Sequence, residues 1–181
     1  MLKPHVMIDF TKLDYLKIGN ERQKRAYEVL TKYRIFEVLE QYSPILAGTI
    51  PIEIDVEGSD LDIICEVDFN FEEDFLDDII WSKMIPMNVD LKAKCLHING
   101  EKSLVINFKL EEFPIEIFAQ NKPTIAQNAY RHMIVEYKIL QEKGKEFKQK
   151  IIDLKKKGIK TEPAFGVLLG LENPYEDLLK I

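Results

Sequence analysis

Apolar residues recur every three or four positions from Ala26 to Leu39. Asn20 precedes them, and Gln23 follows it three residues later, which is the spacing of a capping box at the start of a helix. Pro44 cannot continue a helix because it lacks a backbone N–H and its ring clashes with the preceding turn. We therefore predict a helix that begins at Asn20 and ends before Pro44.

The next part of the chain is dominated by short apolar and alternating segments, which predict strands. These segments are residues 45–49, 60–67, 94–98, 104–110 and 113–118. One stretch among them, residues 71–83, has helical spacing instead. The pairs Asn99-Gly100 and Glu111-Glu112 are predicted to form the turns that join the last three strands.

Beyond residue 120 the pattern becomes helical. Thr124 is suited to cap a helix that continues to Glu142, and residues 147–158 predict a shorter amphipathic helix. Pro163 and Pro174 each suit the first turn of a brief helix near the end of the chain.

These elements predict an α/β (α+β) fold in which a mixed sheet of about five strands is flanked by helices. We expect one domain over residues 1–181, with a core at about 20–120 and a helical C-terminal part at about 121–181. The chain has 181 residues, 46% of them apolar and 31% charged, which is enough to bury a sizeable core.

Targeting and redox signals favour a cytoplasmic protein. The longest strongly apolar stretch, residues 164–171, is much shorter than the ~20 residues of a membrane span, so we expect no membrane contact. Charged residues interrupt the start of the chain, which disfavours a signal peptide. Cys65 and Cys95 lie in strand-like segments without metal-binding spacing, and we expect both thiols to be reduced.

The charge is unevenly distributed. The net charge is −6, and no basic residue stands between Arg34 and Lys83, an interval with fourteen carboxylates. Residues 143–160 carry eight lysines against two acidic residues. The acidic balance disfavours binding to duplex nucleic acid. The acidic interval is either solvated surface or, in part, a site for a divalent cation.

Asp60 and Asp62 stand out within the acidic interval because alternate residues of a strand point to the same face. Two such charges about 4 Å apart repel by about 4 kcal/mol at an effective dielectric constant of about 20. Either the pair is solvated at the start of the strand, where it caps a turn, or a cation lies between the carboxylates. Magnesium held by carboxylates and substrate phosphates is the commonest such arrangement.

Two further features favour the cation. Gly48-Thr49 lies upstream, where glycine lets the backbone approach a phosphate and a hydroxyl can donate to it. Glu116 lies in the middle of the apolar strand 113–118, where an unpaired charge is costly. The alternative for Glu116 is an edge strand that faces water, which Pro114 would suit.

Together these segments resemble the polymerase-beta-type nucleotidyltransferase superfamily. The elements of the resemblance are Gly48-Thr49, a ten-residue spacer, Asp60-Leu61-Asp62-Ile63 and the strand around Glu116. A closer resemblance is to an uncharacterised bacterial branch of that superfamily, and its matching segments are residues 46–66, 127–133 and 160–165.

The resemblance implies a magnesium-dependent transfer of a nucleoside monophosphate from a nucleoside triphosphate to a hydroxyl group of a small molecule or a protein. Asp60, Asp62 and Glu116 would hold two magnesium ions and form the catalytic carboxylates. Gly48 and Thr49 would contact the triphosphate. Ser59 would either steady its turn or reach a phosphate. Templated polymerisation is disfavoured because the acidic chain offers no basic channel.

The chain departs from the superfamily in the spacer, where a basic residue is common. Residues 50–58 contain three carboxylates and no Lys or Arg. Phosphate charge must then be met by metal, backbone or basic residues elsewhere. Our best candidate is Arg131, on the helix after the Glu116 strand, and the others are Lys109, Lys122, Lys138 and the lysines of residues 143–160.

The missing base leaves two alternatives to an enzyme: a non-catalytic nucleotide-binding or regulatory protein that keeps the fold, and a structural domain whose carboxylates are surface caps. His132 is expected to be a packing residue or a surface residue of its helix, because no second histidine or cysteine lies at a metal-binding spacing from it.

Overall fold

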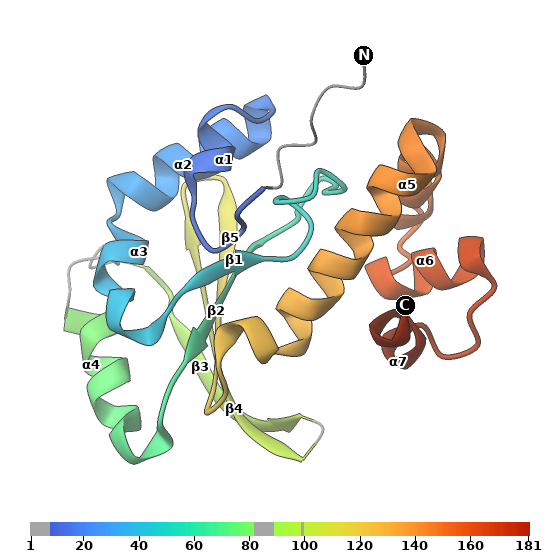
Figure 1. The fold of residues 1–181 in the computed structure, drawn as a ribbon. Coiled ribbons are helices and arrows are strands. Elements are labelled where there is room, and N and C mark those ends of the chain that lie inside the picture. Colours follow the sequence, from blue (N-terminus) through green and yellow to red (C-terminus); the bar gives the residue numbers. More distant parts are fainter. Residues whose placement is uncertain (1–7, 82–88, 99) are drawn as a thin grey trace.

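The computed structural model describes residues 8–81, 89–98 and 100–181 (Figure 1). Its sheet is formed by β1 (Ile45–Ala47), β2 (Leu61–Glu66), β3 (Lys92–Ile98), β4 (Glu101–Leu110) and β5 (Phe113–Gln120). In this described part the strand order is β1-β2-β5-β4-β3. The pair β2–β5 is parallel and the other three pairs are antiparallel. The predicted mixed sheet is therefore confirmed.

Helices cover both faces of this sheet. They are α1 (Asp14–Lys17), α2 (Glu21–Lys32), α3 (Ile35–Val38), α4 (Glu72–Trp81), α5 (Asn128–Lys156), α6 (Thr161–Leu169) and α7 (Pro174–Asp177). In Figure 1, α1 to α4 lie on one side of the sheet and α5 to α7 on the other. Short 3-10 turns cover Glu40–Tyr42, Phe69–Phe71, Thr124–Ala126 and Leu178–Lys180. Among the described residues, no helix is both long and apolar enough to cross a bilayer.

The start of α2 is the capping box that the sequence predicts. Asn20 Oδ1 accepts a hydrogen bond from the Gln23 backbone N–H at 2.9 Å, and Gln23 Oε1 accepts one from the Asn20 N–H at 3.0 Å. The helix does not continue to residue 43, however. Arg34 has a left-handed backbone, with φ of 54°, and this breaks the segment into α2, α3 and a 3-10 turn.

The C-terminal helices also begin and end differently from the prediction. Thr124 starts a 3-10 turn, and α5 begins at Asn128 with Gln127 as its extended flanking residue. Gly144 has φ of 77° and ψ of −169°, and it divides α5 near the predicted end of the first helix. The turn at Glu111-Glu112 is confirmed. Of the pair predicted to join β3 and β4, Asn99 lies outside the described residues.

Two hydrophobic clusters fill the space on the two faces of the sheet. Leu61, Ile63 and Cys65 of β2 belong to the cluster that includes residues of α2 and α4. Ile64 belongs to the other cluster, which includes residues of α5 and α6. Because side chains alternate along a strand, Asp62 shares the face of Ile64. The Asp62 side chain is thus directed toward α5 and α6.

Candidate active site

Asp62 and Glu116 lie directly opposite each other on the parallel strands β2 and β5. Opposite residues on neighbouring strands share a face of the sheet, so the two carboxylates point to the same side. Asp60 lies just before β2, and its charge raises the pKa of both Asp62 and Glu116. The fold therefore brings the three predicted carboxylates into one neighbourhood, although they are distant in sequence.

The carboxylates destabilise one another's charged forms. Burial raises the pKa of Asp62 to about 8, and the negative charges of Asp60 and Glu116 add to this effect. Burial and Asp60 also raise the pKa of Glu116. The Asp62 carboxylate forms no hydrogen bond or ion pair within the described part of the chain. A hard cation would relieve this repulsion, and oxygen ligands of this kind suit magnesium.

The carboxylates are not already arranged as a metal cage. Within residues 8–81, 89–98 and 100–181, no three His, Cys, Asp or Glu side chains form a group that could hold an ion as they stand. The donor chemistry fits magnesium, because all three groups are carboxylates and two of them, Asp62 and Glu116, share one face of the sheet. Binding an ion would require their side chains to move toward it.

Gly48 makes room for Asp62. Its φ is 79°, and a Cβ atom placed on it would lie 2.1 Å from Asp62 Oδ2. The reason is the β1–β2 register, which pairs Ala47 with Asp62 and leaves Gly48 beside the carboxylate. A glycine is therefore required at this position even without a ligand, because a larger residue would clash with the Asp62 carboxylate. Its lack of a side chain also lets a phosphate approach the backbone.

The spacer loop between Gly48 and the carboxylates is held from both of its ends. Ser59 Oγ accepts a hydrogen bond from the Val56 N–H at 2.9 Å, so this serine steadies the turn, one of its two predicted roles. Gln23 Nε2 donates to the carbonyls of Ile50 and Pro51, both at 3.0 Å. The loop is thus fixed to the first turn of α2.

Basic residues from distant elements compensate the acidic spacer. Arg22 Nε lies 3.9 Å from Asp55 Oδ2, and Arg22 Nη2 donates to the Ser59 carbonyl at 3.3 Å. Lys148 of α5 forms an ion pair with Glu53. Two of the three carboxylates of the spacer, Asp55 and Glu53, therefore have basic partners from α2 and α5.

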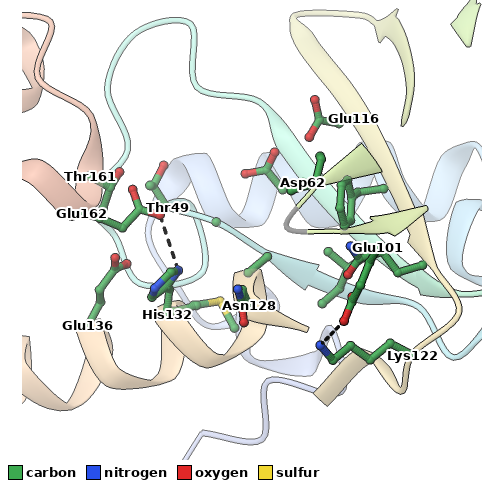
Figure 2. A pocket seen from close by; sticks show the side chains of 17 residues that line it. Thr49, Asp62, Glu101, Glu116, Lys122, Asn128, His132, Glu136, Thr161 and Glu162 are labelled. Carbon is green, nitrogen blue, oxygen red and sulfur yellow. Dashed lines mark hydrogen bonds and ion pairs between the residues drawn. The ribbon is translucent and has the colours of Figure 1, made fainter. Parts of the chain in front are cut away.

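A cavity of about 400 Å³ opens between this face of the sheet and the helices α5 and α6 (Figure 2). Four of the predicted site residues line it, namely Gly48, Thr49, Asp62 and Glu116. Asp60, Ser59 and Arg131 are not among its lining residues. The cavity therefore joins the glycine-threonine turn to two of the three carboxylates.

Arg131 does not line this cavity, although its hydrogen-bond partner Asn128 does. Its side chain is exposed and lies 3.4 Å from Asn128 Oδ1. The lining residues of α5 include His132 and Glu136, which are one turn apart. Met133, the other neighbour of His132, does line the cavity, so Arg131 lies at the margin of the helix face that borders it. The expected contact of Arg131 with phosphate stays a prediction, and this geometry gives it no support.

Lys155 is the basic side chain that the fold does bring near the carboxylates. It is half-buried, and burial lowers its pKa. The charges of Glu136, Asp55, Glu162 and Asp62 act on it in the opposite direction. A sequence signal for this placement exists, because Lys155 follows the buried Ile151 by four residues and so shares its face of the helix.

Glu136 is a site residue that the sequence analysis missed. It lines the cavity, is only 4% exposed, and its Oε1 atom has no hydrogen-bond partner. Burial raises its pKa to about 8, with a contribution from Glu162. The sequence signal for this site residue is its position between the buried Met133 and Leu140 of α5, because a glutamate on an apolar helix face is costly unless it is paired or binds a ligand.

His132 has a structural role beside Glu136. Its Nε2 atom is hydrogen-bonded to the Tyr175 carbonyl at 2.8 Å, and its Nδ1 atom lies 3.6 Å from Glu162 Oε1. The imidazole is buried between α5, α6 and α7. It therefore connects the C-terminal helices, which fits the expected packing residue.

Comparison with protein families gives one match. The model of a domain of unknown function, DUF4269, matches residues 28–181. The chain belongs to the DUF4269 family. Comparison of the DUF4269 chain with curated proteins gave no match.

Solved structures with a similar fold include enzymes that act on RNA ends. A Cid1 poly(U) polymerase with Mg 3'-dATP bound has a TM-score of 0.52 and 13% identity, covering 76% of this chain and 41% of that one. The GLD-2/RNP-8 complex has a TM-score of 0.54 and 15% identity, and the match covers 86% of this chain and 60% of that one. A cytoplasmic RNA terminal U-transferase has a TM-score of 0.50 and 14% identity, and the match covers 79% of this chain and 42% of that one.

These similarities concern the fold. The DUF4269 chain has the fold of polymerase-beta-type nucleotidyltransferases, and it spans less than two thirds of the length of each of these proteins. The mixed sheet and the shared face of its carboxylates agree with that assignment. Function at this level of identity has to be argued from the site.

Proposed function

We propose that this DUF4269 protein is a magnesium-dependent nucleotidyltransferase that moves a nucleoside monophosphate from a nucleoside triphosphate to a hydroxyl group of a small molecule or a protein. The observation that carries the proposal is the register of β2 and β5, in which Asp62 and Glu116 share a cavity-lining face with Gly48 and Thr49. Structures of Cid1 with Mg 3'-dATP and with MgGTP support magnesium and a triphosphate for a protein of this fold.

Each of these residues has a role in this proposal. Asp60, Asp62 and Glu116 would hold magnesium, which would screen the phosphates and lower the pKa of the acceptor hydroxyl. The Gly48 backbone and the Thr49 hydroxyl contact the triphosphate. Lys155 supplies positive charge to the phosphates in place of a spacer base, because it is the lysine whose charge acts on Asp62.

The chemical step is an in-line displacement at the α-phosphorus. The acceptor oxygen forms a bond to this phosphorus while the bond from the phosphorus to the oxygen that bridges it to the β-phosphate breaks. Pyrophosphate leaves with the bonding electron pair. Glu116 accepts the hydroxyl proton and passes it to water.

The first test is thermal unfolding in the presence of magnesium and each nucleoside triphosphate. A ligand that binds only the native state stabilises it by mass action, by about 2.7 kcal/mol at a hundred times its Kd. We expect at least one triphosphate to raise Tm with magnesium and not with EDTA. Asp62→Asn should abolish this rise.

Glu57→Gln is the matched control, because Glu57 is an exposed carboxylate of the same loop and should leave the rise intact. Circular dichroism of both variants checks that they fold. If no triphosphate raises Tm, or if Asp62→Asn keeps the full rise, the proposed function is wrong.

A non-catalytic nucleotide-binding protein with the same fold is the second candidate. Two observations favour it: the spacer carries no base, and no preformed metal group occurs in the part of the chain that the structure describes. Pyrophosphate release separates the two candidates. Binding of a magnesium triphosphate without release, across a broad screen of hydroxyl acceptors, would favour the regulatory protein.

A further inference from the structure

One end of the cavity holds a carboxylate without a partner. Glu136 is 4% exposed, and its Oε1 atom accepts no hydrogen bond. Figure 2 shows its carboxylate turned toward Glu162, across the cavity from Glu116. A buried acceptor without a donor destabilises the folded protein, and more so when it is charged. This cost is explained if the Glu136 carboxylate binds a ligand that enters the cavity.

A second carboxylate faces the same end. Glu162 of α6 lines the cavity, and its charge raises the pKa of Glu136. Its nearest basic partner within the described chain is His132, at 3.6 Å from Nδ1 to Oε1. That imidazole already has its other nitrogen bonded to the Tyr175 carbonyl. Two helices thus present two carboxylates to one small space.

The positive charges nearby do not neutralise this end. The cavity is lined by five carboxylates and one lysine, and Lys122 is already paired with Glu101 at 3.0 Å. The charge of Lys155 acts on Glu136 and Glu162, but Lys155 forms no ion pair within 4.0 Å in the described structure and does not line the cavity. If magnesium and the triphosphate occupy the end with Asp62 and Glu116, no cation is left in direct contact with Glu136.

A triphosphate is the wrong ligand for this end, because its negative charge would repel Glu162 and would further disfavour the charged form of Glu136. An alkylammonium group has the opposite sign and several donors, and it offers both carboxylates charge-assisted hydrogen bonds. We infer that the Glu136–Glu162 end of the cavity binds a protonated amine of the acceptor, whose hydroxyl then lies toward Glu116. The acceptor class is an amino alcohol, and this inference rests on the proposed function.

The test measures binding of amines without nucleotide or metal. Backbone amide shifts of the full chain are followed by NMR during titration with glucosamine, with spermidine, and with glucose as the neutral counterpart of glucosamine. We expect both amines to shift amides of α5 and α6 around Glu136 and Glu162, and glucose to leave them unchanged. Glu136→Gln should weaken amine binding about tenfold, the effect of losing one charged hydrogen bond.

The matched control is Glu142→Gln, which removes an exposed carboxylate from the same helix and should not change amine binding. The inference fails if neither amine shifts these amides at tens of millimolar, if glucose shifts them equally, or if Glu136→Gln binds amines as the wild type does. Glu162→Gln provides an independent second variant, with the same expected loss.

The same variants separate this inference from the proposed function. Glu136→Gln should keep the magnesium-triphosphate rise in Tm, because Glu136 contacts the acceptor and not the nucleotide. If this variant loses the nucleotide effect and keeps amine binding, the glutamate end belongs to the nucleotide and the inference is wrong. If the wild type binds amines but no triphosphate, the amine site stands and the proposed nucleotidyl transfer does not.

Discussion

Gly48 shows how a single residue links the backbone to the proposed chemistry. Its positive φ strains any other L-residue by about 1 kcal/mol, and a Cβ atom would lie 2.1 Å from Asp62 Oδ2. Gly48→Ala should therefore displace the Asp62 carboxylate as well as strain the turn. We expect a loss of about 1–3 kcal/mol in unfolding free energy and a loss of the magnesium-triphosphate rise in Tm.

Gly58 provides the control for this substitution. It has φ of 84° in the same loop region, but a Cβ atom there would meet nothing within 4 Å. Gly58→Ala should lose a similar amount of stability from backbone strain and keep the nucleotide effect. Equal nucleotide effects in the two alanine variants, measured by thermal unfolding, would contradict the role given to the contact between Gly48 and Asp62.

At the scale of elements, α2 and the spacer loop form one unit through Gln23. The side chain completes the capping box and also donates to the carbonyls of Ile50 and Pro51. Gln23→Ala should remove all of these bonds, whereas Asn20→Ala removes only capping interactions. We expect a loss of about 1 kcal/mol for Asn20→Ala and about 1–3 kcal/mol more for Gln23→Ala.

Urea unfolding measures both losses. Because the loop carries Ser59 and leads to Asp60, Gln23→Ala should also weaken binding of the magnesium triphosphate, while Asn20→Ala should not. If the two variants lose the same stability, the bonds to the loop contribute nothing and the coupling between α2 and the site is wrong.

The sequence predicted the elements best where local chemistry decides them. The capping box at Asn20 and the alternation in β2 and β5 depend on neighbouring residues, and both are seen in the structure. The break at Arg34 could not be predicted, because the apolar spacing continues through it while the backbone turns left-handed. No hydrophobic pattern reports the φ angle of a single non-glycine residue.

The site was predicted unevenly for a related reason. Asp62 and Glu116 converge because strand alternation and parallel pairing follow from sequence pattern. The sequence places Arg131 on the helix after the Glu116 strand, but its side chain is exposed and does not line the cavity. The four-residue spacing from Ile151 indicates that Lys155 shares the buried face of its helix, but the packing that brings this face near Asp62 is tertiary and has no local signature.

For the whole molecule, the two buried carboxylates predict how stability depends on pH. The pKa of Asp62 rises from 3.8 to about 8, and that of Glu136 from 4.5 to about 8. The folded protein therefore binds more protons than the unfolded chain between these limits, so its stability must fall as pH rises. Each group contributes a slope of at most about 1.4 kcal/mol per pH unit.

The window lies between pH 4.5 and about 8 when both groups act together. Urea unfolding at steps of pH should show wild-type stability falling across it, and Asp62→Asn with Glu136→Gln should flatten the curve and be more stable at pH 8. With saturating magnesium triphosphate, the Asp62 part of the fall should also disappear, since the bound state favours the carboxylate. If the unfolding free energies of the wild type and the double variant depend on pH in the same way between pH 5 and pH 8, the fold does not hold these two carboxylates protonated.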